Sequence, residues 1–147
     1  MLSKKVLALD VGKKKIGVAI SDILGISANP SGFINASNTK KALEKVGEFI
    51  KENDIGTVVV GLPKNLDGTI GPQAEHCISF GKQVADLYSI DVVWQDERLS
   101  TREAERMLIE SGMSRSKRKV ENDQVAAAII LRSYLDRLSM SNSNNKE

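Results

Sequence analysis

Two runs of β-type residues open the chain. Apolar residues predominate at positions 6–11 and 16–21, and the four residues between the two runs begin with Gly12. Two such runs joined by a short, glycine-started loop predict an antiparallel hairpin. A weaker run over 31–35, after the turn residues Asn29 and Pro30, predicts a third strand.

The middle of the chain alternates between helical and strand patterns. Apolar residues in 40–52 recur at helical spacing with charged residues between them, which predicts an amphipathic helix. Residues 57–61 are nearly all apolar and are followed by Pro63, as in a buried parallel strand. A turn-rich loop then leads to a helix over about 74–88 and to a strand over 91–95.

Two further helices are expected toward the end of the chain. Ser100 and Glu103 have capping-box spacing and Gly112 suits a helix end, so the first covers about 100–112. A basic, polar connector follows over 113–120. The last helix, 122–138, is apolar on nearly every side in its first half and should be deeply buried. We expect the polar residues 139–147 to form a disordered tail.

The order of elements predicts the α/β class. An opening antiparallel meander followed by strand–helix crossovers implies a mixed sheet with helices on both faces. In such sheets, ligands gather beyond the carboxyl ends of the strands. The chemistry of this protein is therefore expected at that edge.

Length and composition narrow the class further. The chain has 147 residues, which suits one domain, assigned here to 1–138. The net charge of +2 does not by itself indicate a nucleic-acid partner. The single cysteine, Cys77, cannot form an intrachain disulfide. The chain shows neither a signal-peptide pattern nor an apolar run of roughly 18 residues, so we expect a cytoplasmic protein without a membrane partner.

Three carboxylates are placed to meet at the expected edge. Asp10 ends the first strand on the face of Val6 and Ala8, and Glu97 follows the last strand. Asp123 stands at the expected start of the last helix. Gathered carboxylates repel one another unless a cation compensates them, and oxygen ligands select Mg²⁺ or Mn²⁺. Two such ions about 4 Å apart can promote phosphoryl displacement.

Spacing alone leaves a simpler interpretation open. Asp10 and Asp123 can also be turn or helix-start residues, and Glu97 a solvated loop charge. His76, the only histidine, stands beside Glu75 on an expected exposed helix face and is interpreted as structural.

Basic residues adjoin the three acids along the chain. Such cations can hold a phosphate backbone, although they can equally be solvated or paired with neighbouring glutamates. Asn65, in the turn-rich loop, is a further candidate contact. The candidate nucleic-acid-binding residues are Lys13, Lys14, Lys15, Asn65, Arg98, Arg102, Arg115, Lys117 and Arg118.

Five motifs in order resemble the YqgF family of RNase H-like proteins. They are LDVG at 9–12, IGVAISD at 16–22, VVGLPKNLDG at 59–68, DERLST at 96–101 and DQVAAAIIL at 123–131. The resemblance implies a five-stranded RNase H-like sheet, with Asp10, Glu97 and Asp123 matching the acidic triad of the family. It also implies Mg²⁺ or Mn²⁺ as cofactor. One departure is Lys15, where the family usually has arginine, which alone can grip phosphate in a bidentate manner.

The resemblance leaves three functions open. The first is an endonuclease that matures the 5′ end of pre-16S ribosomal RNA. The second is a Holliday junction resolvase acting on branched DNA, which would favour a symmetric dimer. The third is a nucleic-acid-binding module without catalysis. For the protein itself we expect a monomer or a weak homodimer.

Overall fold

A computed structural model describes residues 3–97 and 115–144 of the chain. Its strands are β1 (Lys5–Val11), β2 (Lys15–Ser21), β3 (Ala28–Asn35), β4 (Ile55–Leu62) and β5 (Asp91–Asp96). Its helices are α1 (Thr39–Glu52), α2 (Pro72–Tyr88) and α4 (Arg115–Asn144). The helix expected over 100–112 lies outside the described residues.

The five strands form one mixed sheet in the order β3-β2-β1-β4-β5. β1 pairs antiparallel with β2, and β2 pairs antiparallel with β3, which confirms the opening meander. β4 then lies parallel to β1, and β5 lies parallel to β4. The carboxyl ends of β1, β4 and β5 therefore meet at one edge, as the sequence predicted.

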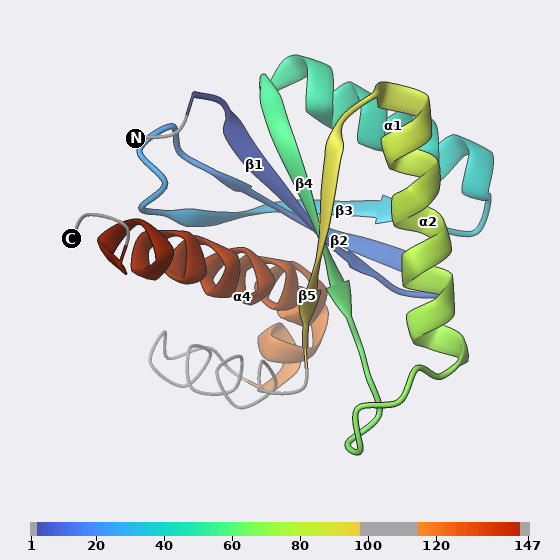
Figure 1. Ribbon diagram of the computed structural model, residues 1–147. Coiled ribbons are helices and arrows are strands. Elements are labelled where there is room, and N and C mark those ends of the chain that lie inside the picture. The colour runs from blue at the N-terminus through green and yellow to red at the C-terminus, as the bar shows by residue number, and fades with distance from the viewer. Residues whose placement is uncertain (1–2, 98–114, 145–147) are drawn as a thin grey trace.

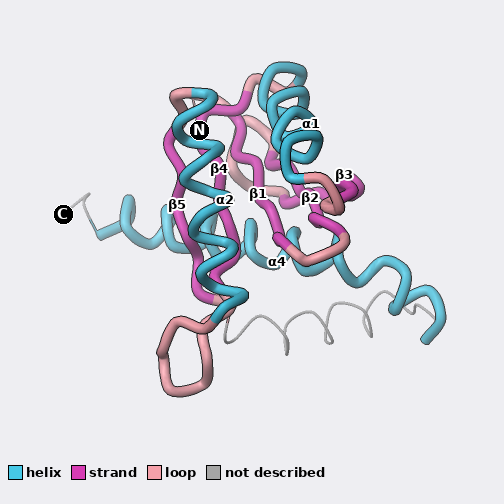
Figure 2. Tube along the Cα trace, turned by 90° about the vertical axis from the view of Figure 1, so that its right-hand side faces the viewer, coloured by secondary structure: helices cyan, strands magenta, loops and turns pink. Residues whose placement is uncertain are grey.

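Helices cover both faces of the sheet (Figures 1 and 2). α1 and α2 lie on one face, and α4 crosses the other. Alternate residues of β1 divide between the two sides, because side chains along a strand point to opposite faces. Leu7 and Leu9 join the apolar core beneath α1 and α2, while Val6 and Ala8 pack with Ala127 and other residues of α4. Asp10 continues the second series.

The last helix is longer than expected at both ends. It begins at Arg115, so part of the predicted connector over 113–120 is helical, and it continues to Asn144 through residues assigned to a disordered tail. The helix contains no proline, so the backbone hydrogen bonds of the buried segment can continue into its polar ends. The predicted burial is confirmed at its centre, where residues 127–131 are at most 1% exposed.

The third strand begins earlier than expected. β3 starts at Ala28, and it includes Asn29 and Pro30, which the sequence indicated as a loop. Pro30 stands opposite Ala19, and the pairing shifts register between Gly17 and Ala19. A proline is tolerated there because β3 is an edge strand and needs no donor on its open side.

No helix in the described part of the chain is long and apolar enough to cross a membrane.

Candidate active site

Asp10 and Glu97 come together at the carboxyl edge of the sheet. Asp10 lies near the end of β1, the central strand. Glu97 directly follows β5, and its backbone N–H donates to the Leu62 carbonyl at 3.1 Å, which holds the chain close to the end of β4. The Glu97 carboxyl shares a hydrogen bond with that of Asp10. Both side chains are half-buried, on the face that α4 covers.

The environment of Glu97 favours its protonated form. The pKa of the Glu97 carboxyl is raised from 4.5 to about 8, chiefly by burial and then by the charge and the hydrogen bond of the neighbouring Asp10. The negative charge of Asp96 raises the pKa of Glu97 further, by a smaller amount. The protein thus holds two carboxyl groups where one negative charge disfavours the other.

Gly61 provides the space for this arrangement. A methyl group on its Cα would lie 2.6 Å from Cδ of Glu97 and 2.5 Å from Cδ1 of Ile130 on α4. Gly61 stands one position beyond the Leu9–Val60 pair, beside Asp10 on the neighbouring strand. The missing side chain lets the Glu97 carboxyl lie against the sheet next to Asp10, and lets α4 approach.

Gln95 adds an oxygen atom to the same region. It stands opposite Gly61 in the β4–β5 pairing, and its Oε1 is buried without a hydrogen-bond partner among the described residues. Buried polar atoms nearly always have a partner. An amide oxygen and two carboxylates form an oxygen-only donor set, which fits a hard divalent cation. The described residues contain no group of three His, Cys, Asp or Glu side chains that could hold a metal.

Asp123 lies inside α4 and not at its start, because the helix begins eight residues earlier than Asp123. The position excludes a helix-start role for this residue, while its side chain lies outside the described atoms. The simpler interpretation is also wrong for the other two acids. Asp10 belongs to a strand and not to a turn, and Glu97 is half-buried against Asp10 rather than solvated.

The opposite face of the sheet fixes the end of β1. Gln73 and Cys77 of α2 both donate to the carbonyl of Val11, at 2.7 Å from Nε2 and 3.6 Å from Sγ. Burial, with the nearby Glu97 and Asp10 charges, raises the pKa of the Cys77 thiol to about 12. α2 therefore anchors the strand that carries Asp10, and Cys77 remains a neutral donor.

The basic candidates divide into described and undescribed residues. Lys13, Lys14 and Lys15 are exposed in the hairpin after β1, as predicted. Asn65 is exposed, but its amide donates to Thr69 Oγ1 at 2.9 Å and so shapes its own loop. Arg98 and Arg102 lie outside the described residues, and the side chains of Arg115, Lys117 and Arg118, in the first turns of α4, are likewise not described. His76 is exposed on α2, as expected.

The sheet order, the helices on both faces and the carboxyl pair at the strand ends define an RNase H-like protein. Two solved resolvases share this fold. The RuvC protein of T. thermophilus, in complex with a Holliday junction substrate, aligns at 10% identity with a TM-score of 0.53, covering 92% of this chain and 96% of that one. The Fowlpox virus resolvase with its junction DNA aligns at 16% identity and a TM-score of 0.54, covering 91% and 98%.

Sequence comparison identifies the family more closely. The RuvX family, described as Holliday junction resolvase, matches residues 4–137. A protein of Clostridioides difficile named "Putative pre-16S rRNA nuclease" is 48% identical over 136 residues, which cover 92% of this chain and 96% of that protein. The chain belongs to the RuvX family, which is the YqgF family named above. The predicted family and fold are thus confirmed.

Gly61 and Gln95 belong to this site, although neither was among the residues predicted from the sequence. An isolated glycine within an apolar strand often marks a close approach by another group, so Gly61 carried a usable signal. The only sequence signal for Gln95 was its position, two residues before Glu97 and on the same face of the strand.

Proposed function

We propose that this protein is a metal-dependent endonuclease that cleaves the precursor of 16S ribosomal RNA. The observation that carries the proposal is the hydrogen-bonded pair of half-buried carboxyls, Asp10 and Glu97, at the carboxyl edge of the sheet. Keeping two such groups together disfavours their ionisation unless a cation compensates them. The name of the Clostridioides difficile relative supports ribosomal RNA as the substrate.

Asp10, Glu97 and Asp123 are the proposed metal ligands, with Gln95 as a neutral oxygen donor beside them. The ion we expect is Mg²⁺ or Mn²⁺, because every donor is oxygen. Bound there, a pair of such ions would supply activation of the attacking water and stabilisation of the leaving oxygen. The chain itself supplies the rigid placement: Asp10 comes from the central strand, and Glu97 is seated over Gly61.

The basic residues are proposed to hold the phosphate backbone. Lys13, Lys14 and Lys15 follow Asp10 directly, so cations and metal ligands adjoin in the chain. The arginines and lysines at 98, 102, 115, 117 and 118 would extend this positive surface. Binding through such residues weakens as salt rises.

A second candidate is resolution of branched DNA. The description of the family that matches residues 4–137, Holliday junction resolvase, favours it. The same carboxylates would cut DNA, but two strands must be cut across a two-fold junction, so a symmetric dimer is required. A protein that is monomeric on the junction would contradict this candidate.

One experiment separates the candidates. Labelled pre-16S ribosomal RNA and a labelled four-way DNA junction are each incubated with the protein in Mn²⁺, in Mg²⁺ and in EDTA, alongside the Asp10→Asn variant. This substitution removes a ligand charge with little change in volume, so the variant should fold and should not cut. We expect metal-dependent cutting of the RNA alone.

The other outcomes are equally informative. Cutting of the junction alone would favour the resolvase. Retained cutting by the Asp10→Asn protein would contradict the proposed ligand set. Binding without cutting of either substrate, in either metal, would favour a module that only binds nucleic acid.

A further inference from the structure

An exposed aromatic ring shares a row of the sheet with Asp10. In the β1–β2 pairing Asp10 stands opposite Gly17, and in the β2–β3 pairing Gly17 stands opposite Phe33. Neighbouring strands lie about 4.8 Å apart, so the backbones of Phe33 and Asp10 are separated by roughly 10 Å. Phe33 is 45% exposed, which is unusual for a large apolar side chain.

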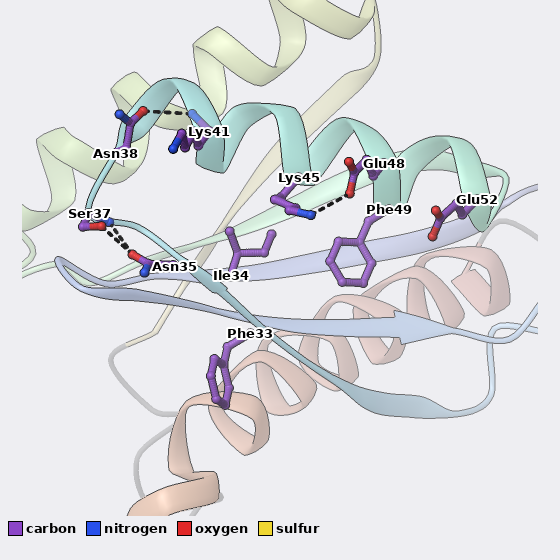
Figure 3. A pocket seen from close by; sticks show the side chains of 10 residues that line it. All are labelled: Phe33, Ile34, Asn35, Ser37, Asn38, Lys41, Lys45, Glu48, Phe49 and Glu52. Atoms are coloured by element: carbon purple, nitrogen blue, oxygen red, sulfur yellow. Dashed lines mark hydrogen bonds and ion pairs between the residues drawn. The ribbon is translucent and has the colours of Figure 1, made fainter.

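The ring points to the same face as the carboxyl pair. Ile34 is 4% exposed and belongs to the core beneath α1, so the preceding residue must point to the other side. Figure 3 shows this arrangement: Ile34 and Phe49 lie between the sheet and α1, whereas the Phe33 ring lies on the opposite side of β3, toward α4. α4 packs against β3 on that face.

A cation accompanies the ring. The Lys15 ammonium lies 4.7 Å from the centroid of the Phe33 ring. Lys15 begins β2, and its side chain is solvent-exposed with a flexible stem. An ammonium on an exposed ring can exchange this contact for a phosphate at little cost. An aromatic face for a base and a nearby cation for the backbone are the two elements of a single-strand binding surface.

The surroundings of Phe33 favour a nucleotide over a protein surface. The other exposed apolar side chains near these strands, Ile23, Leu24 and Ile26, lie in the loop at the opposite end of β2 and β3. Among the residues that the structure describes, Phe33 is therefore an isolated ring next to a lysine rather than part of an apolar patch.

The groove on the other face is a weaker candidate for the same ligand. A hollow of about 560 Å³, which Phe33 also borders, lies between α1 and β3 (Figure 3), but its two lysines are balanced by two glutamates. Lys45 pairs with Glu48 at 3.3 Å, and Glu52 adds a further negative charge. A phosphate is attracted only weakly to a surface whose charges cancel.

We propose that Phe33 and Lys15 form a subsite for an unpaired nucleotide of the substrate near the cleaved phosphodiester, with the base stacked on Phe33 and a phosphate held by Lys15. The proposal rests on the nuclease function above and deepens it, since it requires a single-stranded segment beside the cut. Duplex nucleic acid would not place a base on this ring.

The test measures binding separately from cleavage. In the Asp10→Asn background with Mg²⁺, a fluorescent single-stranded RNA, the same sequence as DNA, and the matched RNA and DNA duplexes are titrated by anisotropy. Three variants at the subsite are compared: Phe33→Leu, Phe33→Tyr and Lys15→Gln. Leu87→Ala, at an apolar residue of α2 that is 59% exposed, serves as the matched control.

We expect Phe33→Leu to weaken single-strand binding about 5- to 150-fold, the factor for losing one base–aromatic stack. Phe33→Tyr, which keeps an aromatic ring, should bind the single strand as tightly as the parent protein. Lys15→Gln should lower the salt dependence of single-strand binding. The affinity for duplexes should change less than twofold in all three variants. The RNA and DNA arms show which sugar the subsite accepts. A 2-aminopurine in the strand should change its fluorescence when it leaves its neighbouring bases for the Phe33 ring, and the Phe33→Leu variant should lose this change.

Unchanged single-strand binding in Phe33→Leu, or an equal loss on duplexes, would overturn the subsite. These results are independent of the cleavage assay: a protein that cuts but is indifferent to Phe33 keeps the function and loses the subsite. A protein that never cuts but stacks a base on Phe33 keeps the subsite and loses the nuclease mechanism. Thermal unfolding of each variant confirms that it is folded.

Discussion

The Glu97 carboxyl lies over the Cα of Gly61, in the space that a side chain would otherwise fill. Gly61→Ala should therefore displace Glu97 from Asp10 and lower cleavage by at least about 10-fold. Overpacking at this position should also cost about 1–3 kcal/mol of unfolding free energy. Cleavage rates and urea unfolding of the same preparation measure both effects.

Gly56→Ala is the matched control for this prediction. It makes the same change in the same strand, and its methyl would meet Cβ of Lys4 at 2.8 Å, far along β4 from the carboxyl edge. We expect a loss of stability without a comparable loss of cleavage. Equal effects of the two alanines on cleavage would mean that Gly61 matters only for folding.

The stability of the metal-free protein should fall as pH rises through the neutral range. The folded protein keeps a proton on Glu97 up to a pH near its pKa of about 8, whereas the unfolded chain releases it near 4.5. Between these values the folded state binds more protons, so its stability decreases with pH, by at most about 1.4 kcal/mol for each pH unit. Urea unfolding in EDTA at pH 5, 6, 7 and 8 measures the slope.

Glu97→Gln serves as the reference for that slope. Glutamine resembles the protonated acid and does not titrate, so the variant should gain stability relative to the wild type as pH increases. Parallel curves for the two proteins would refute the raised pKa.

Divalent metal should offset the loss of stability that occurs as pH rises. An ion bound by Asp10 and Glu97 compensates their charges and binds only the folded protein, so Mg²⁺ or Mn²⁺ should raise the unfolding temperature, and more at pH 8 than at pH 6. Scanning calorimetry with and without metal tests this. The Asp10→Asn protein should show a much smaller shift, and an undiminished shift in that variant would place the ion elsewhere.

Cys77 should be inert in the native protein. It is 1% exposed, and its pKa of about 12 leaves almost no thiolate at pH 8. Its reaction with a disulfide reagent such as DTNB should therefore follow the unfolding of the protein and become rapid in urea. Fast labelling of the native protein, without denaturant, would contradict the burial.

Ser21 should contribute to stability through a single backbone contact. Its Oγ accepts a hydrogen bond from the Val6 N–H at 2.8 Å, and the residue is 2% exposed. Ser21→Ala leaves that buried donor unpaired and should cost about 1–3 kcal/mol. Ser37→Ala removes an exposed turn contact with Asn35 and should cost less than about 0.5 kcal/mol. A similar cost for both would show that burial is not the cause.

Most of the fold could be predicted because periodicity reports burial. The alternation in β1 placed Asp10 on the face of Val6 and Ala8, and the structure has it there. The apolar run before Pro63 predicted the buried strand β4, which extends a little further at both ends, from Ile55 to Leu62. These patterns are local consequences of the two faces of a sheet.

The deviations occur where tertiary contacts override local signals. Pro30 has the local signal of a loop residue, yet pairing with β2 on one side only lets it join β3. The polar sequence before Asp123 indicated a connector, because helix propensity without an apolar stripe gives no periodic signal. The glycine at position 61 signalled that some group approaches the strand closely. The groups that do so, Glu97 and Ile130, are distant in sequence, so the local pattern could not identify them.

The two carboxyls of the site come from parts of the sheet that open with different ease. β1 has a strand on each side, whereas β5 is an edge strand whose residues are only half-buried or exposed. Edge elements exchange their amide hydrogens through small local openings, and central strands only through global unfolding. Fraying of β5 would thus draw Glu97 away from Asp10 while the core stays intact. Cleavage activity should therefore be lost at a lower temperature than the one at which the protein unfolds.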